Sequence, residues 1–88
     1  MILPYPDTKQ TILIVDDEPI NIRALQSTLG GEYNLLFATS GEMVLDMVKS
    51  GVQPDLILLD IIMPGMDGFE VCRRLKNDPK TQHIPLVF

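Results

Sequence analysis

The sequence predicts an α/β domain built on an open, parallel sheet. Two observations carry this prediction: short aliphatic runs alternate with helical patterns along the chain, and no run alternates polar with apolar residues. Runs of that kind are typical of strands buried on both faces, as in parallel sheets. Helical crossovers between such strands give right-handed connections and place helices on both faces.

The first part of the chain predicts a strand, a helix and a second strand. The first run is β-branched and aliphatic, which favours an inner strand. Pro19 suits the first turn of a helix, in which apolar residues, Ile20 among them, recur at helical spacing until Gly30. The predicted bounds are 11–15 for the strand, 19–29 for the helix and 34–38 for the second strand.

The next helix begins at a capping signal, and two more apolar runs follow. Thr39 and Glu42 have the spacing of a capping box, and the helix that they start is expected to run as far as Gly51. Residues 55–60 are the third predicted strand, and residues 84–88 are the fourth.

A third helix is predicted between these two strands. Asp67 has the form of its N-cap, and the Asn-Asp-Pro sequence at 77–79 ends it. Helical spacing places Phe69, Cys72 and Leu75 on its inner side. Cys72 is therefore expected to pack rather than to react.

The composition describes one small globular domain and argues against two classes of partner. The chain has 88 residues, a hydrophobic share of 45% and a net charge of −5 at pH 7. Binding to nucleic acid or to an anionic membrane surface needs clustered Lys and Arg, which an acidic chain supplies poorly. No apolar run approaches the roughly 20 residues that span a bilayer. We expect neither nucleic acid nor membrane as a direct partner.

The N-terminal segment and the single cysteine indicate the compartment. Residues 1–10 lack the basic region and apolar stretch of a signal peptide, so we expect an extended leader there and the domain at residues 11–88. One cysteine excludes an intramolecular disulfide and is compatible with a reducing compartment. The expected location is the cytoplasm.

Three aspartates stand at the carboxyl ends of predicted strands. Asp16 and Asp17 follow the first strand, and Asp60 ends the third. Ligands of open α/β sheets bind outside the carboxyl ends of the strands. In the flavodoxin-like order 2-1-3-4-5, strands one and three are neighbours and the three carboxylates meet at one edge. If the sheet is flavodoxin-like and doubly wound, as we expect, the sequence predicts an acidic site at this edge.

Three carboxylates at one edge predict a site for a hard divalent cation. Mg²⁺ suits it, with Mn²⁺ as an alternative, because Mg²⁺ takes one or two protein carboxylates together with waters and a phosphate oxygen. A metal-bound aspartate can also act as the nucleophile toward a phosphoryl group. Each aspartate taken singly is better explained by a loop or a helix cap, and for Asp67 a cap is sufficient. The conjunction of Asp16, Asp17 and Asp60 favours the metal site.

The chain resembles the receiver domain of two-component response regulators. Three motifs carry the resemblance: Ile-Leu-Ile-Val-Asp-Asp-Glu-Pro at 12–19, Pro-Asp-Leu-Ile-Leu-Leu-Asp at 54–60 and Met-Pro-Gly-Met-Asp-Gly at 63–68. The resemblance extends from Thr11 to Phe88 and implies a CheY-like fold.

The resemblance also implies a role for each site residue. Asp60 would be the phosphoacceptor, Asp17 a direct ligand of Mg²⁺, and Asp16 a ligand directly or through water. The backbone carbonyl of Ile62 would complete the protein ligands. Its apolar side chain permits this, since a backbone oxygen can bind a hard cation whatever the side chain.

The chain departs from the family's pattern at its end. The family's Thr or Ser after the fourth strand and its Lys after the fifth, which contact the phosphoryl oxygens, would both come after Phe88. We therefore expect an incomplete fold with strands 1 to 4 and helices 1 to 3, that is, a truncated receiver. An edge strand without its neighbour invites pairing with another chain, so the fragment is expected to self-associate.

The implied function is Mg²⁺-dependent acceptance of a phosphoryl group from a sensor histidine kinase or phosphotransfer protein. The acyl phosphate would then switch an attached C-terminal output module. The domain would turn over no external substrate, so we do not expect an enzyme. Two alternatives are a module that binds partners without phosphorylation and a Mg²⁺-dependent phosphatase of the haloacid dehalogenase type. The phosphatase needs an Asp two residues after its nucleophile, where Ile62 stands.

Overall fold

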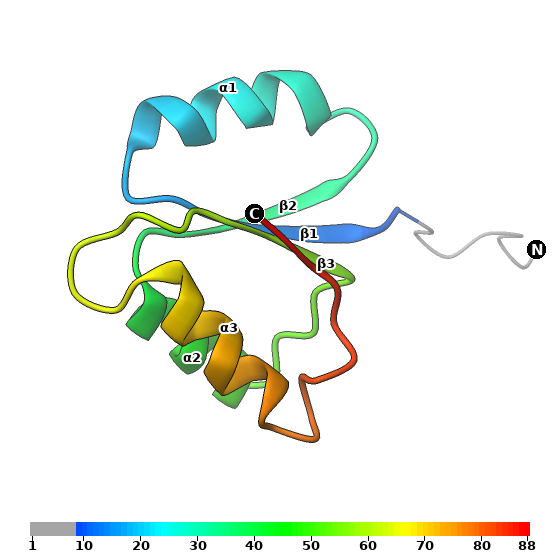
Figure 1. Ribbon diagram of the computed structural model, residues 1–88. Coiled ribbons are helices and arrows are strands. Elements are labelled where there is room, and N and C mark those ends of the chain that lie inside the picture. Colours follow the sequence, from blue (N-terminus) through cyan, green and yellow to red (C-terminus); the bar gives the residue numbers. More distant parts are fainter. Residues whose placement is uncertain (1–8) are drawn as a thin grey trace, which may run out of the picture.

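Four parallel strands form one sheet in the order β2-β1-β3-β4, with helices on both faces (Figure 1). This computed structural model describes residues 9–88, so the predicted leader over residues 1–10 lies outside the described part except for Lys9 and Gln10. The strands are β1 (Thr11–Val15), β2 (Asn34–Ala38), β3 (Leu56–Leu59) and β4 (Leu86–Val87). The helices are α1 (Pro19–Leu29), α2 (Gly41–Lys49) and α3 (Gly68–Lys76). The predicted α/β class and flavodoxin-like strand order are confirmed.

The face of the sheet toward α2 and α3 holds the core. Side chains alternate along a strand, so Leu13 and Val15 of β1 point to this face while Ile12 and Ile14 point to the other. Leu13 and Val15 are at most 1% exposed. The buried cluster around them consists of Leu13, Val15, Ala38, Val44, Ile57, Leu59, Met63, Val71, Leu75 and Ile84.

The opposite face is covered, within residues 9–88, by α1 alone (Figure 1). A single helix over four strands has solvent on its flanks, and no residue of α1 is buried. Leu25 and Leu29 of its predicted apolar stripe are half-buried. Ile20 is 70% exposed and was wrongly included in that stripe.

Helix α2 starts one residue later than its capping signal predicts. Its N-cap is Ser40, not Thr39, because Ser40 has extended backbone and its Oγ accepts a hydrogen bond from the Met43 amide (3.1 Å). The Thr39 hydroxyl instead donates toward the Met43 sulfur. The helix ends at Lys49, with Ser50 as its C-cap, rather than at Gly51.

Helix α3 is capped as predicted but buries a different face. Asp67 accepts a hydrogen bond from the Glu70 amide (2.9 Å). Val71 and Leu75 are buried and Cys72 is half-buried, whereas Phe69 is 60% exposed and does not face the core. Phe69 follows Gly68, which is buried against the loop after β3, so its side chain lies about 100° further round the helix.

The fourth strand is shorter than the predicted run 84–88. Only Leu86 and Val87 are in the strand, because Pro85 has no amide to donate, although its carbonyl accepts from the Ile57 amide (3.0 Å). Ile84 is buried in the preceding turn. That turn is held by Thr81, whose buried hydroxyl donates to the Leu75 carbonyl (2.7 Å).

Candidate functional site

Hydrogen bonds of the sheet bring the ends of β1 and β3 to the same level. Val15 pairs with Leu59, and the Asp60 amide donates to the Val15 carbonyl (3.0 Å). On the other side of β1, the Asp16 amide donates to the Ala38 carbonyl (3.1 Å). The main chain of both aspartates is therefore fixed by the ladder just beyond the regular strands.

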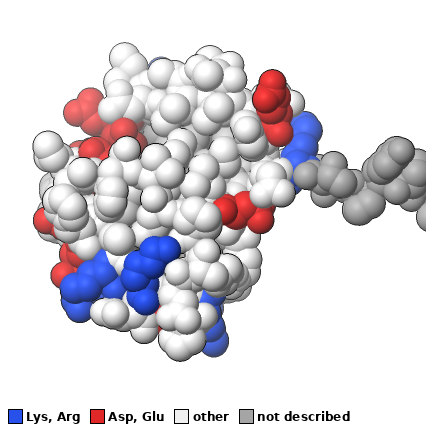
Figure 2. All heavy atoms as spheres, turned by 45° about the vertical axis from the view of Figure 1, so that its right-hand side comes forward, with Lys and Arg blue, Asp and Glu red and all other residues white. Residues whose placement is uncertain are grey.

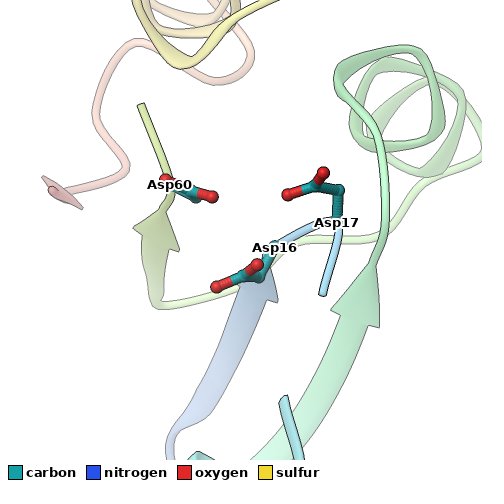
Figure 3. A group of neighbouring side chains, drawn as sticks. All are labelled: Asp16, Asp17 and Asp60. Carbon is teal, nitrogen blue, oxygen red and sulfur yellow. The ribbon is translucent and has the colours of Figure 1, made fainter. Parts of the chain in front are cut away.

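The side chains of Asp16, Asp17 and Asp60 converge at this edge of the sheet (Figure 3). One carboxylate oxygen from each residue lies within 4.8 Å of the others, and all three residues are half-buried. Like charges this close repel, and an oxygen-only donor set suits a hard divalent cation. The residues present thus fit the cation that the sequence predicts.

The three carboxylates differ in how they are held. Both oxygens of Asp16 accept hydrogen bonds: Oδ1 from the Glu18 amide (2.9 Å) and Oδ2 from the Asn21 side-chain amide (3.1 Å). Asp60 Oδ1 accepts from the Ile62 amide (3.1 Å). Asp17 accepts no hydrogen bond of this kind among residues 9–88. Its carboxylate is therefore the one with most freedom to approach a cation directly.

The loop after β3 packs tightly against the start of α3. The Gly68 amide donates to the Ile61 carbonyl (2.9 Å), and a Cβ at Gly68 would lie 2.5 Å from the Asp60 carbonyl oxygen and 2.7 Å from the Ile61 Cα. Only glycine permits this approach. Gly65 in the same loop has φ of 76°, which glycine adopts without strain. The loop thereby fixes the backbone that carries Asp60.

The side chain of Ile62 points into solvent next to the site and is 84% exposed. Its amide holds Asp60 as described above, which is consistent with a role for its backbone rather than its side chain. The predicted use of its carbonyl as a ligand stays a prediction.

An open hollow of about 310 Å³ lies beside the site on the α1 side of the sheet. Its polar lining residues are Asp16, Asn21 and Asp60, and Leu25 and Phe88 are among its apolar ones. Sequence reasoning missed Asn21 altogether. Its position five residues after Asp16, in the first turn of a helix that follows the strand directly, is a signal that could have found it.

A second charged group lies on α3, away from the aspartates. Glu70 forms ion pairs with Arg73 and Arg74, and these guanidinium groups lower the pKa of Glu70 to about 2. Arg73 and Arg74 are exposed, so these ion pairs lie on the solvated side of α3. On the face drawn in Figure 2, Lys and Arg occur in small groups rather than as a broad basic surface.

The comparisons with known proteins agree with this geometry. The family model of the response regulator receiver domain matches residues 12–88. The chain therefore belongs to the receiver domain family of response regulators, the proteins of two-component signal transduction.

Relatives of known sequence and structure support this assignment. The response regulator PleD of Caulobacter vibrioides is 52% identical over 77 residues, which are 86% of this chain and 17% of that protein. A probable cyclic di-GMP phosphodiesterase of Vibrio cholerae is 45% identical over 78 residues, 89% of this chain and 18% of that protein. The crystal structure of the N-terminal domain of a response regulator receiver protein from Methanoculleus marisnigri superimposes with a TM-score of 0.81 at 44% identity, covering 86% of this chain and 62% of that one.

The chain spans less than a fifth of the length of these two curated relatives. The match is confined to the 77 and 78 residues given above, so the rest of each relative has no counterpart in this chain. Within residues 9–88, no helix is long and apolar enough to cross a membrane.

Proposed function

We propose that Asp60 accepts a phosphoryl group from the phosphohistidine of a sensor kinase or phosphotransfer protein. The observation that carries the proposal is the convergence of Asp60 with Asp16 and Asp17 at the carboxyl edge of the sheet. In the transfer, a carboxylate oxygen of Asp60 forms a bond to phosphorus, the phosphorus–nitrogen bond of the donor breaks, and the imidazole leaves with the bonding electron pair. The product is an acyl phosphate on Asp60.

The proposed metal ligands are Asp16, Asp17, Asp60 and the backbone carbonyl of Ile62. A bound Mg²⁺ would neutralise charge on the phosphoryl oxygens and on the three carboxylates. Asp17 is the preferred direct ligand, since its oxygens accept no hydrogen bond from residues 9–88. Asp16 keeps one lone pair or more on each oxygen and is suited to bind directly or through water. The amide of Ile62 orients Asp60 both as a ligand of the cation and as the acceptor of the phosphoryl group.

Phosphorylation would act on an output module in the parent protein, in keeping with relatives of which this chain matches less than a fifth. A receiver of this kind works in the cytoplasm, where kinase and Mg²⁺ are available. The domain itself would be an acceptor and not an enzyme with an external substrate. A phosphatase of the haloacid dehalogenase type is disfavoured because the exposed side chain at position 62 is an isoleucine.

Isothermal titration with Mg²⁺ and a mass-resolved reaction with a small phosphoramidate donor test this proposal. Asp17→Asn is expected to abolish most Mg²⁺ binding, and Asp60→Asn to abolish the phosphoryl mass shift in the parent protein. Asp46→Asn, an equal change at an exposed position of α2, is the matched control and should leave both unchanged. Equal Mg²⁺ affinity in wild type and Asp17→Asn would refute the metal site. A retained mass shift in Asp60→Asn would refute the acceptor, and an unphosphorylated but partner-binding protein would favour the interaction module.

We further propose that the 88-residue chain self-associates when isolated. Val87 is 47% exposed and Phe88 57%, and both line the open hollow beside α1. The outer edge of β4 has no strand partner within residues 9–88. Such edges and apolar surfaces favour sheet extension, exchange of elements or stacking between copies. Sedimentation equilibrium is expected to give a mass above that of a monomer, and a cooperatively unfolding monomer would refute this.

A further inference from the structure

Asn21 is the one side chain outside the three aspartates that hydrogen-bonds to their carboxylates within residues 9–88. It stands in the first turn of α1, and its Nδ2 donates to Asp16 Oδ2 at 3.1 Å. An ionised carboxylate can only accept, so the atom that faces it must be the amide nitrogen.

The hydrogen bond between Asn21 and Asp16 also connects the first turn of α1 to the end of β1. Glu18, the N-cap of α1, makes no side-chain cap. The Asp16 carboxylate binds the start of the helix instead: its Oδ1 accepts a hydrogen bond from the Glu18 amide, and its Oδ2 accepts one from Asn21. Two donors on two different oxygens fix the rotation of the carboxylate as well as its place.

We propose that Asn21 is a positioning residue, which acts through Asp16 to orient that carboxylate for the divalent cation. The inference rests on the proposed metal site. A neutral amide suits the task, because a Lys or Arg at this position would neutralise the charge that attracts the cation. An Asp at the same position would repel Asp16 and could not donate.

A simpler role for Asn21 would be to stabilise α1, and the two roles predict different effects of Asn21→Ala. Asn21 is exposed, and alanine is the better helix former. If the side chain mattered only for the helix, Asn21→Ala would change the melting temperature and leave Mg²⁺ affinity unchanged. If it positions Asp16, Mg²⁺ affinity falls whether or not the melting temperature changes.

The experiment is a double-mutant cycle on the full 88-residue chain, read by isothermal titration with Mg²⁺ and repeated with Mn²⁺ by water-proton relaxation. Asn21→Ala is expected to weaken binding about tenfold, the usual size of the effect when a partner of a ligand is removed. In the Asp16→Asn background the same change should have no further effect. Gln26→Ala, which removes an amide from the exposed side of the same helix, should bind as wild type does. Asn21→Ser, which restores a short donor, should recover part of the loss and provides a second variant.

The outcomes separate this inference from the proposed site. If wild type binds Mg²⁺ and Asp17→Asn does not, but Asn21→Ala matches wild type, the role of Asn21 is refuted and the site stands. The role would also be refuted if Asn21→Ala weakened Mg²⁺ binding by the same factor in the Asp16→Asn background as in the wild type. Asn21 would then act through the helix and not through Asp16. Wild type without Mg²⁺ binding would overturn the site and this inference together.

Discussion

The two faces of the sheet are packed to different degrees. On the face toward α2 and α3, Leu13, Ile57 and Val71 are fully buried and belong to one continuous cluster. On the face toward α1, Ile12 and Ile14 of the central strand are buried, but Leu58 is half-buried and the helix contributes no buried residue. Burial of apolar area is the main favourable term in folding, so the first face carries most of the stability. The acidic edge lies where the two faces meet. Helix α3 packs against the backbone of Asp60 through Gly68, and α1 supplies Asn21, which donates to Asp16.

The largest effect should come from matched truncations on the two faces. Leu75→Ala removes a side chain that is 2% exposed and should lower the free energy of unfolding by about 2–5 kcal/mol. Leu25→Ala on α1 makes the same change at a half-buried position and should cost about 1 kcal/mol. Urea denaturation of both variants checks the difference. Equal losses would break the comparison and show that α1 carries as much of the core as α3.

An intermediate effect is expected at the contact between α3 and the loop that carries Asp60. Gly68→Ala places a methyl group against the Asp60 carbonyl and the Ile61 Cα, so the helix or the loop must shift, at about 1–3 kcal/mol. The shift should also weaken Mg²⁺ binding, because Asp60 moves with its backbone. Gly31→Ala is the control, since no atom lies within 4 Å of its added Cβ. Thermal melts and Mg²⁺ titrations are the measurements, and a Gly68→Ala protein identical to wild type in both would contradict the role of this contact.

The smallest effect concerns the solvent side of α3. Because Arg73 and Arg74 lower the pKa of Glu70 from 4.5 to about 2, ionised Glu70 stabilises the folded chain above pH 4.5. That contribution is lost as the pH falls toward 2. Glu70→Gln should therefore lower the melting temperature slightly at pH 7, less so at high salt, and hardly at all near pH 2. Glu32→Gln in the exposed turn before β2 is the control, and a pH-independent difference would show that charge is not the cause.

Local patterns predicted the fold well where one signal dominated. The apolar runs gave all four strands, and Pro19 and Asp67 marked two helix starts correctly. Phe69 was misplaced because helical spacing does not say which face is inward when the glycine beside it packs against backbone. Thr39 was misassigned because two adjacent hydroxyl residues both fit an N-cap, and only the backbone angles of Ser40 decide between them.

The sequence predicted the three aspartates of the candidate site but not the residues that hold them in place. Aspartates at strand ends converge once the strand order is known, and the flavodoxin-like order that the resemblance implies places β1 beside β3. Asn21 and Gly68 act by contact across the site rather than by sequence pattern. Their roles depend on the distance from Asn21 to Asp16 and from Gly68 to Asp60, which only the assembled loops define.

The pairing of β1 with β3 has a consequence for the order in which the chain folds. Thr11 and Asp55, hydrogen-bonded at the start of this pair, are 44 positions apart in the sequence. Closing so long a loop is an entropic cost that must be met before the contacts form, and parallel pairs are accordingly slow. Asp60 joins Asp16 and Asp17 only when this closure is complete. A cation that needs all three carboxylates cannot guide the early steps, so we expect Mg²⁺ to slow unfolding while leaving the refolding rate nearly unchanged, as stopped-flow measurements in urea with and without Mg²⁺ would show.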